Sequence, residues 1–283
     1  VDALDVELLV PTSVQDGRVA VGTMAVDARL ADHARAREAE RQQHVDQIVC
    51  PAVMRGIEHR DIAASTLFHG EIQAGPPAFL GPVPLVFYRP GAWKPERVED
   101  AGQGVMHGIF VERGNPCSIL AASFAGIFRI ERSGKSWKRE KVAAGSPLPW
   151  PKSGSSDIAI GRLGKETFIA SIEPWHGNEL AVYTRQRGAW VREVLDSSLV
   201  DGHTVLAADF DNDGFDEIIS GARGGGGVVD MHKRTAAGWA KTAIDRSLTA
   251  ASCEAVDLDA DGRLELVCIG SATAEMRLSK LKR

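Results

Sequence analysis

The sequence lacks the features by which composition reveals a membrane protein or a nucleic-acid-binding protein. No apolar run approaches the roughly 20 residues that a membrane-spanning helix needs. Its 33 Lys and Arg residues are outnumbered by 38 Asp and Glu residues, so no basic excess is present to bind phosphates. The chain does not open with the charged and then apolar pattern of a signal peptide. We expect a soluble protein without a membrane or nucleic-acid partner, either cytoplasmic or secreted or periplasmic after removal of a leader; its oligomeric state is not predicted.

Cysteine is scarce, and the common catalytic motifs are missing. Cys50, Cys117, Cys253 and Cys268 form no CxxC pair, which argues against a Cys-rich zinc site, and they are too sparse for a disulfide framework. We expect each to have a buried structural role. GxSxG and HExxH are absent, which argues against ordinary hydrolases. The run Gly224–Gly227 is not followed by Lys and Ser or Thr, so we expect a tight turn there and not a phosphate loop.

Short β-branched runs are abundant, and they recur with a fixed period. Each run, such as DIAIG, TFIASIE or DEIISG, is bounded by Gly, Pro, Asp or Ser, which is typical of short strands between tight turns. Five segments that open such a strand lie 48 residues apart, at His59, His107, Ser155, His203 and Ala251. A unit of this length with four strands is the size of one β-propeller blade.

A tryptophan marks the outer strand of the repeat. Trp93, Trp137, Trp190 and Trp239 each precede four mostly polar residues and then Val, Leu or Ile, so we expect them to be packing residues. The last unit ends after its third strand, and DVELLV near the N-terminus has no partner nearby. We therefore predict one all-β propeller domain over 1–283, with a degenerate first blade at about 11–58 and clear blades over 59–283. Six blades are favoured within a range of five to seven, and the N-terminal strand closes the ring.

Two loops of the last units share the pattern D-x-D-x-D-G-x-x-E. Alternate carboxylates of such a loop converge, the glycine permits the reversal, the carbonyl at position 7 supplies a neutral oxygen and the glutamate closes the shell. Hard oxygen ligands in this number favour Ca²⁺, with Mg²⁺ as the alternative, in a structural role. The predicted ligands are Asp209, Asp211, Asp213, Phe215 and Glu217 in the first loop, and Asp257, Asp259, Asp261, Arg263 and Glu265 in the second.

These loops and the blade length resemble the FG-GAP or VCBS propeller repeats. The succession EPWHGNELAVYT, DGHTVLAADFDNDGFDEIISGARGGGGV and CEAVDLDADGRLELVCIGSAT is similar to the propeller domain of aldos-2-ulose dehydratases and their bacterial relatives. That resemblance implies a lyase or isomerase acting on keto-sugars. The sequence departs from the fungal members, which carry additional cupin domains and a propeller expected to have seven blades.

Histidines recur at positions that a propeller brings to one face. His59, His107 and His203 open first strands, whereas His69, His176 and Arg223 lie in loops between second and third strands. Strand starts and these loops open on the same face around the axis, so we expect a funnel lined by these side chains, with the acidic loops on the opposite face.

Dehydration beside a carbonyl needs a base, an enolate stabiliser and an acid. Our hypothesis assigns His203 or His176 as base, the neighbouring histidine as acid and Arg223 as the oxyanion stabiliser. In the alternative, three histidines of the funnel hold a catalytic divalent metal that polarises the carbonyl. Glu179 or Glu254 would orient an imidazole, and Trp175 would stack on the sugar. The competing function is a non-catalytic calcium-bound propeller that binds carbohydrate or protein through the same funnel.

Overall fold

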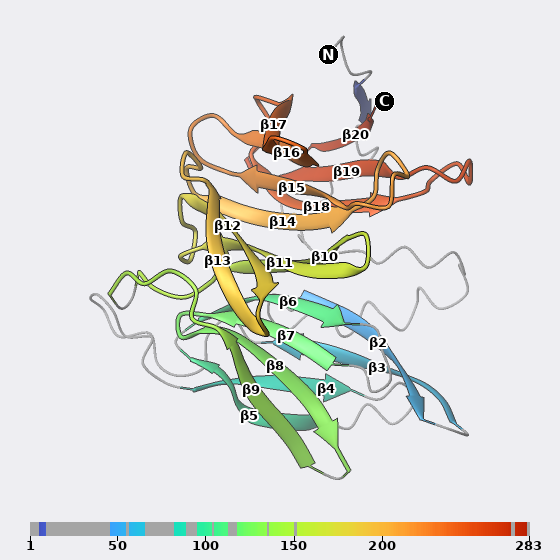
Figure 1. Ribbon diagram of the computed structural model, residues 1–283. Helices are drawn as coiled ribbons and strands as arrows, with labels where there is room; N and C mark the ends of the chain where they lie inside the picture. The colour runs from blue at the N-terminus through green and yellow to red at the C-terminus, as the bar shows by residue number, and fades with distance from the viewer. Residues whose placement is uncertain are drawn as a thin grey trace.

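The fold was examined in a computed structural model. It describes residues 6–9, 46–54, 57–65, 82–88, 95–103, 105–112, 118–134, 136–149, 152–272 and 275–281. The described strands form five four-stranded sheets, and in four of them the strands lie in chain order: β2–β5, β6–β9, β10–β13 and β14–β17. The fifth sheet has the order β1-β20-β19-β18. Figure 1 shows these sheets following one another through the molecule, with β1 beside β20.

All described elements are strands. The first sheet contains β2 (Asp46–Met54), β3 (Ile57–Ser65), β4 (Pro82–Tyr88) and β5 (Pro95–Gln103). The second contains β6 (Met106–Glu112), β7 (Ser118–Ser123), β8 (Gly126–Ser133) and β9 (Ser136–Ala143). The third contains β10 (Asp157–Leu163), β11 (Glu166–Glu173), β12 (Glu179–Gln186) and β13 (Ala189–Asp196). The fourth contains β14 (Gly202–Ala208), β15 (Glu217–Ala222), β16 (Val228–Thr235) and β17 (Gly238–Asp245). The fifth contains β18 (Ala250–Val256), β19 (Glu265–Gly270), β20 (Met276–Lys280) and β1 (Val6–Leu9).

Neighbouring sheets meet through their first strands, in the order β2, β6, β10, β14 and β18. This arrangement is propeller-like, because successive antiparallel sheets pack face to face around their innermost strands. The predicted all-β architecture is therefore confirmed. Closure of the ring stays a prediction, although the predicted N-terminal strand does join the last sheet as its outer strand.

The blade count and one blade boundary differ from the prediction. Five sheets are formed by the described residues, not six, and residues 10–45 lie outside the described part. The 48-residue step assumes blades of equal length, but the first sheet extends from residue 46 to 103. Position 59, which is 48 residues before His107, therefore falls in the second strand of the first sheet. His59 lies inside β3, paired with Ala52, and does not open a first strand.

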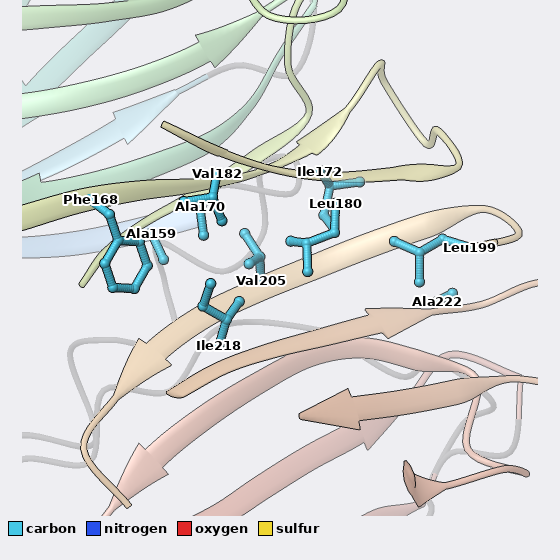
Figure 2. Close-up of a cluster of buried hydrophobic side chains, with 10 residues drawn as sticks. All are labelled: Ala159, Phe168, Ala170, Ile172, Leu180, Val182, Leu199, Val205, Ile218 and Ala222. Carbon is cyan, nitrogen blue, oxygen red and sulfur yellow. The ribbon is translucent and has the colours of Figure 1, made fainter. Parts of the chain in front are cut away.

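The core lies between the sheets. Middle strands such as β7 and β15 are buried along their whole length, because their sheets have another sheet on each face. Figure 2 shows Phe168 and Val182 of the third sheet facing Val205 and Ile218 of the fourth. Burial of each such side chain contributes about 1.5–3 kcal/mol to stability. The alternation of sheets thus explains why short strands that are apolar on both faces recur through the sequence.

The outer-strand tryptophans pack as predicted wherever they are described. Trp137, Trp190 and Trp239 are partly buried against the hydrophobic clusters of their sheets. Each ring is also covered by the guanidinium of the arginine five residues before it. Trp93 lies outside the described residues.

One disulfide corrects the expectation that the cysteines are too sparse for disulfides, although both of its cysteines are buried as predicted. Cys253 of β18 and Cys268 of β19 form a disulfide across the two strands. The two residues are 15 apart in the sequence, on either side of an acidic loop, and antiparallel pairing places them directly opposite. Sparse cysteines can therefore pair when a hairpin brings two of them into register.

Candidate functional site

Three histidines from three parts of the chain come together at one end of the inner strands. His107 and His203 are the second residues of β6 and β14, and His176 lies in the loop between β11 and β12. The ring centroids lie 4.7–5.0 Å apart, and the rings are nearly perpendicular to one another. We call these three residues the histidine cluster.

Close backbone packing holds the His176 loop against β14. The Gly202 amide donates a hydrogen bond to the Gly177 carbonyl at 2.9 Å. A Cβ on Gly202 would lie 2.8 Å from the same carbonyl oxygen, so only glycine permits this approach. His176 itself has a φ of 49°, a left-handed conformation that is uncommon for a non-glycine residue. Such conformations cluster at functional sites, where the surrounding structure imposes them.

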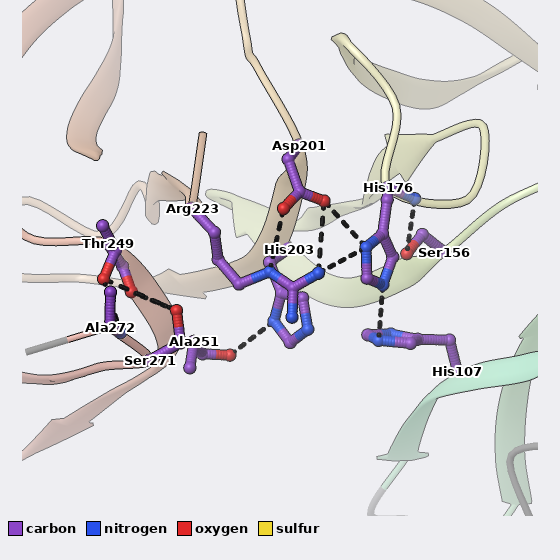
Figure 3. A network of polar contacts seen from close by, with 10 residues as sticks. All are labelled: His107, Ser156, His176, Asp201, His203, Arg223, Thr249, Ala251, Ser271 and Ala272. Atoms are coloured by element: carbon purple, nitrogen blue, oxygen red, sulfur yellow. Dashed lines mark hydrogen bonds and ion pairs between the residues drawn. The ribbon is translucent and has the colours of Figure 1, made fainter. Parts of the chain in front are cut away.

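An arginine–aspartate pair flanks the cluster. Arg223, in the loop between β15 and β16, donates to both carboxylate oxygens of Asp201 at 3.1 and 3.2 Å. Nδ1 of His176 lies 2.7 Å from Asp201 Oδ1 and 2.6 Å from Arg223 Nη2. Figure 3 shows the carboxylate, the guanidinium and the imidazole meeting at this point. The His176 ring is therefore held from its Nδ1 side, with Nε2 directed at His107.

Hydrogen bonds define which ring nitrogens face the cluster. Nδ1 of His203 lies 2.6 Å from the Ala251 carbonyl, which can only accept, so this nitrogen carries the proton and Nε2 keeps its lone pair. Nε2 of His176 lies 3.3 Å from Nε2 of His107. Nδ1 of His107 is buried and makes no hydrogen bond of ordinary geometry. The Ser156 backbone lies near this ring and acts to raise its pKa, against the larger effect of burial.

The surroundings keep the imidazoles neutral. Burial above all, together with the neighbouring His203, His176 and Arg223, lowers the pKa of His107 to about 3. Burial and then Arg223 lower the pKa of His203 to about 4, and the same two causes lower the pKa of His176. Burial of Asp201 works against its ionisation, but the hydrogen bond from Arg223 holds its pKa below the usual value. At neutral pH the cluster is therefore a set of neutral nitrogen ligands beside a fixed ion pair.

The histidine cluster fits a divalent metal ion. His107, His176 and His203 each have a ring nitrogen that lies within 4.8 Å of a ring nitrogen of the other two. Metal-bound histidines usually donate their other N–H to a carbonyl or a carboxylate, and the Ala251 carbonyl provides this acceptor for His203. For His176, the Asp201 carboxylate and the Arg223 guanidinium both lie within hydrogen-bond distance of Nδ1. Three protein ligands with open positions are typical of catalytic zinc sites.

The other predicted funnel residues are placed differently. Glu179 pairs with Arg192 at 2.5 Å and so does not orient an imidazole; Asp201 takes that role for His176. Glu254, on β18, is exposed and has no hydrogen bond or ion pair among the described residues. Trp175 is half-buried, with its ring centroid 4.6 Å from that of His176. His69 lies outside the described residues, as does the side chain of His59.

The two acidic loops lie at the opposite ends of the strands from the histidine cluster. His203 is near the start of β14, and the first loop begins directly after the end of that strand at Asp209. Carboxylate oxygens of Asp209, Asp211 and Glu217 lie within 4.8 Å of one another, as do those of Asp257, Asp259 and Glu265. The loops therefore bring predicted ligands together; calcium or magnesium binding stays a prediction.

Sequence reasoning missed Asp201 and two lysines. Asp201 lies two residues before His203, so an acidic residue next to a strand-opening histidine was the available signal. Lys233 contacts Asp211, Asp213 and Glu217 of the first loop, and Lys280 contacts Asp259 and Glu265 of the second. Both lysines face these loops from the third strand of their sheets.

Two family models match separate segments of the chain. The FG-GAP-like repeat matches residues 209–268, and the β-propeller domain of aldos-2-ulose dehydratase matches residues 72–186. Aldos-2-ulose dehydratase of Phanerodontia chrysosporium is 34% identical over 120 residues, which cover 36% of this chain and 13% of that protein. The resemblance predicted from the motifs is confirmed. Because the match covers only 13% of the dehydratase, the activity of that whole protein is a proposal for this chain.

One solved structure shows a similar fold at low sequence identity. A triple-arginine mutant of AofleA from Arthrobotrys oligospora aligns with a TM-score of 0.51 and 13% identity, covering 83% of this chain and 68% of that chain. An α-L-arabinofuranosidase from Clostridium thermocellum aligns with a TM-score of 0.42 and 10% identity, covering 80% and 82%. The likeness to AofleA is one of fold alone. Within the described residues, no helix is long and apolar enough to cross a membrane.

Proposed function

We propose that the chain is a keto-sugar lyase that eliminates water next to a carbonyl at the histidine cluster. The observation that carries this proposal is the convergence of three neutral imidazoles beside the Asp201–Arg223 pair. The match of residues 72–186 to a dehydratase propeller supports a small keto-sugar as the substrate class.

A divalent ion held by His107, His176 and His203 would supply Lewis-acid polarisation of the substrate carbonyl. The protein's own residues make the site ready for it. The Ala251 carbonyl fixes the tautomer of His203, so that this ring presents its Nε2 lone pair. Asp201 and Arg223 both hold His176 at Nδ1, which directs its Nε2 toward His107. Arg223 keeps Asp201 ionised and places a positive charge beside the oxygen on which negative charge develops.

The elimination also requires proton transfer. The proton on the carbon next to the carbonyl passes to a base, and the carbon–carbon double bond forms as the bond to the neighbouring hydroxyl breaks. The protonated base returns that proton to the departing oxygen, which leaves as water. Glu254 is our candidate base, because its carboxylate is exposed and has no hydrogen bond or ion pair among the described residues. It lies three residues after Ala251, whose carbonyl holds His203. Trp175, half-buried beside His176, offers an aromatic face for a sugar ring.

The test is turnover of a panel of keto-sugars, including anhydrofructose and 3-keto-glucosides, followed by the ultraviolet band of a conjugated enone. We expect the band to form with at least one sugar, to disappear after chelation and to return with added divalent metal. Full activity after chelation would exclude the metal and favour direct acid–base catalysis by the imidazoles. Saturable sugar binding without an enone band would show a non-catalytic carbohydrate-binding propeller.

A further inference from the structure

Each acidic loop receives a lysine ammonium group among the carboxylates predicted to bind calcium. Nζ of Lys233 lies 2.9 Å from Asp213 Oδ2 and 3.1 Å from Glu217 Oε1, and it also contacts Asp211. Nζ of Lys280 lies 2.6 Å from Asp259 Oδ2 and 3.7 Å from Glu265 Oε1. Both loops are thus closed by a cation that belongs to the chain.

The two lysines occupy the same place in their sheets. Lys280 is paired directly opposite Glu265, the closing glutamate of the second loop. Ile218 is paired with His232, and the antiparallel register therefore places Glu217 opposite Lys233. The lysine–glutamate pairing is a repeated feature of the two sheets that carry acidic loops.

The sheets without acidic loops lack this lysine. Lys233 directly precedes Arg234, which covers Trp239. The residue that precedes the corresponding arginine is Thr184 in the third sheet and Glu131 in the second. Thr184 lies opposite Phe168, and Glu131 lies opposite Ser118. The lysine at this position of the third strand therefore occurs in the two sheets whose loops carry the carboxylates.

Backbone hydrogen bonds already shape both loops. Asp209 accepts from the amides of Asp213 and Gly214 at 3.0 and 2.8 Å, and Asp257 accepts from those of Asp261 and Gly262 at 3.1 and 3.0 Å. The other carboxylates of each loop still require a positive charge close to them, and one ammonium group with three donors can provide it. Calcium would use the same oxygens, and its double charge would repel an ammonium group held at that distance.

We infer that Lys233 and Lys280 provide the resident cations of the two acidic loops, so that the loops close without calcium. When the lysine is removed, the loop carboxylates repel one another, and the loop then requires a bound metal ion to keep its conformation. The effect is larger for Lys233, which contacts three carboxylates, than for the more exposed Lys280, which contacts two.

The experiment compares the wild-type chain with Lys233→Met and Lys280→Met by thermal unfolding and calcium calorimetry. All chains are first stripped of metal, so that the histidine cluster is in the same state in every sample, and we expect the stripped wild type to melt at the same temperature with and without millimolar calcium. Each variant should melt lower in chelator, recover with calcium and bind calcium at least about 10-fold more tightly than the wild type, a difference of about 1.4 kcal/mol. The control is Lys241→Met, because Lys241 pairs with Asp196 and Asp230 away from the loops; its loss of stability should not be reversed by calcium.

Two results would overturn the inference. One is a wild-type chain that, after it has been stripped of metal, binds calcium at both loops and melts markedly higher with calcium than without it. The other is a pair of lysine variants whose calcium affinity equals that of the wild type. If Lys233→Met does not fold, Lys280→Met at the half-exposed position decides the question.

Discussion

Replacement of His203 by alanine is expected to lower turnover of the keto-sugar by about 10²–10⁴-fold. The substitution removes one of three nitrogens that converge in the histidine cluster, and with it the neutral ligand set that the proposed chemistry requires. His203 is at the edge of its strand and half-buried, so the fold should persist. Enone formation and thermal unfolding, measured on the same preparation, separate loss of activity from loss of structure.

His232→Gln is the matched control for this prediction. His232 is also buried, but it bonds to Ser220 on β15 and makes no contact with the histidine cluster among the described hydrogen bonds and ring contacts. Glutamine can keep a hydrogen bond to the Ser220 hydroxyl, so activity should stay within a few-fold of the wild type. Equal activity in His203→Ala and the wild type would contradict the assignment of the site.

Replacement of Arg192 by methionine is expected to destabilise the fold by about 3–5 kcal/mol. Arg192 donates to the fully buried Glu173 at 2.8 Å and to Glu179 at 2.5 Å. Without the guanidinium, the Glu173 carboxylate keeps two neutral donors, the Tyr183 hydroxyl at 2.5 Å and the Ser171 hydroxyl. Because Glu173 ends β11, directly before the loop that carries His176, the variant should also weaken the site. Urea unfolding measures the effect.

The destabilisation of Arg192→Met should shrink as the pH falls. Burial raises the pKa of Glu173 above its ordinary value even with Arg192 present, and removal of the positive charge raises it further. A buried acid with a raised pKa costs stability while it is ionised, so the cost is greatest at pH 7 and falls away toward about pH 5 as the carboxyl group is protonated. Arg185→Met is the control, because Arg185 is exposed; it should cost less than about 1 kcal/mol at either pH. An equal loss in Arg192→Met at both pH values would contradict this account.

Much of the fold was predictable because local signals and the repeat agree. Turn residues bound each β-branched run, and the 48-residue step correctly located the strands that open near His107, His203 and Ala251. Strand starts and the loops between second and third strands share one face of a propeller, so the convergence of His107, His176 and His203 followed from topology. Their roles in catalysis remain predictions.

The remaining differences come from contacts that periodicity cannot encode. His59 was misplaced because the first sheet is longer than the repeat, so the step reached β3. The Cys253–Cys268 disulfide depends on hairpin register, which sequence spacing alone did not reveal. Asp201 pairs with Arg223, which is 22 residues away in the sequence, and Lys233 pairs with Glu217, which is 16 residues away. Each pairing depends on the position that a long side chain reaches in the folded structure. Such pairings are tertiary and have no local pattern.

The metal content of the purified chain tests the histidine cluster most directly. Elemental analysis of the wild type, His203→Ala and Lys233→Met should find one transition-metal ion per chain in the wild type and in Lys233→Met. His203→Ala should contain none, and its enone-forming activity should be lost with the ion. A wild-type chain that contains no such ion, takes up none on addition and still converts the sugar in chelator would contradict the proposed centre.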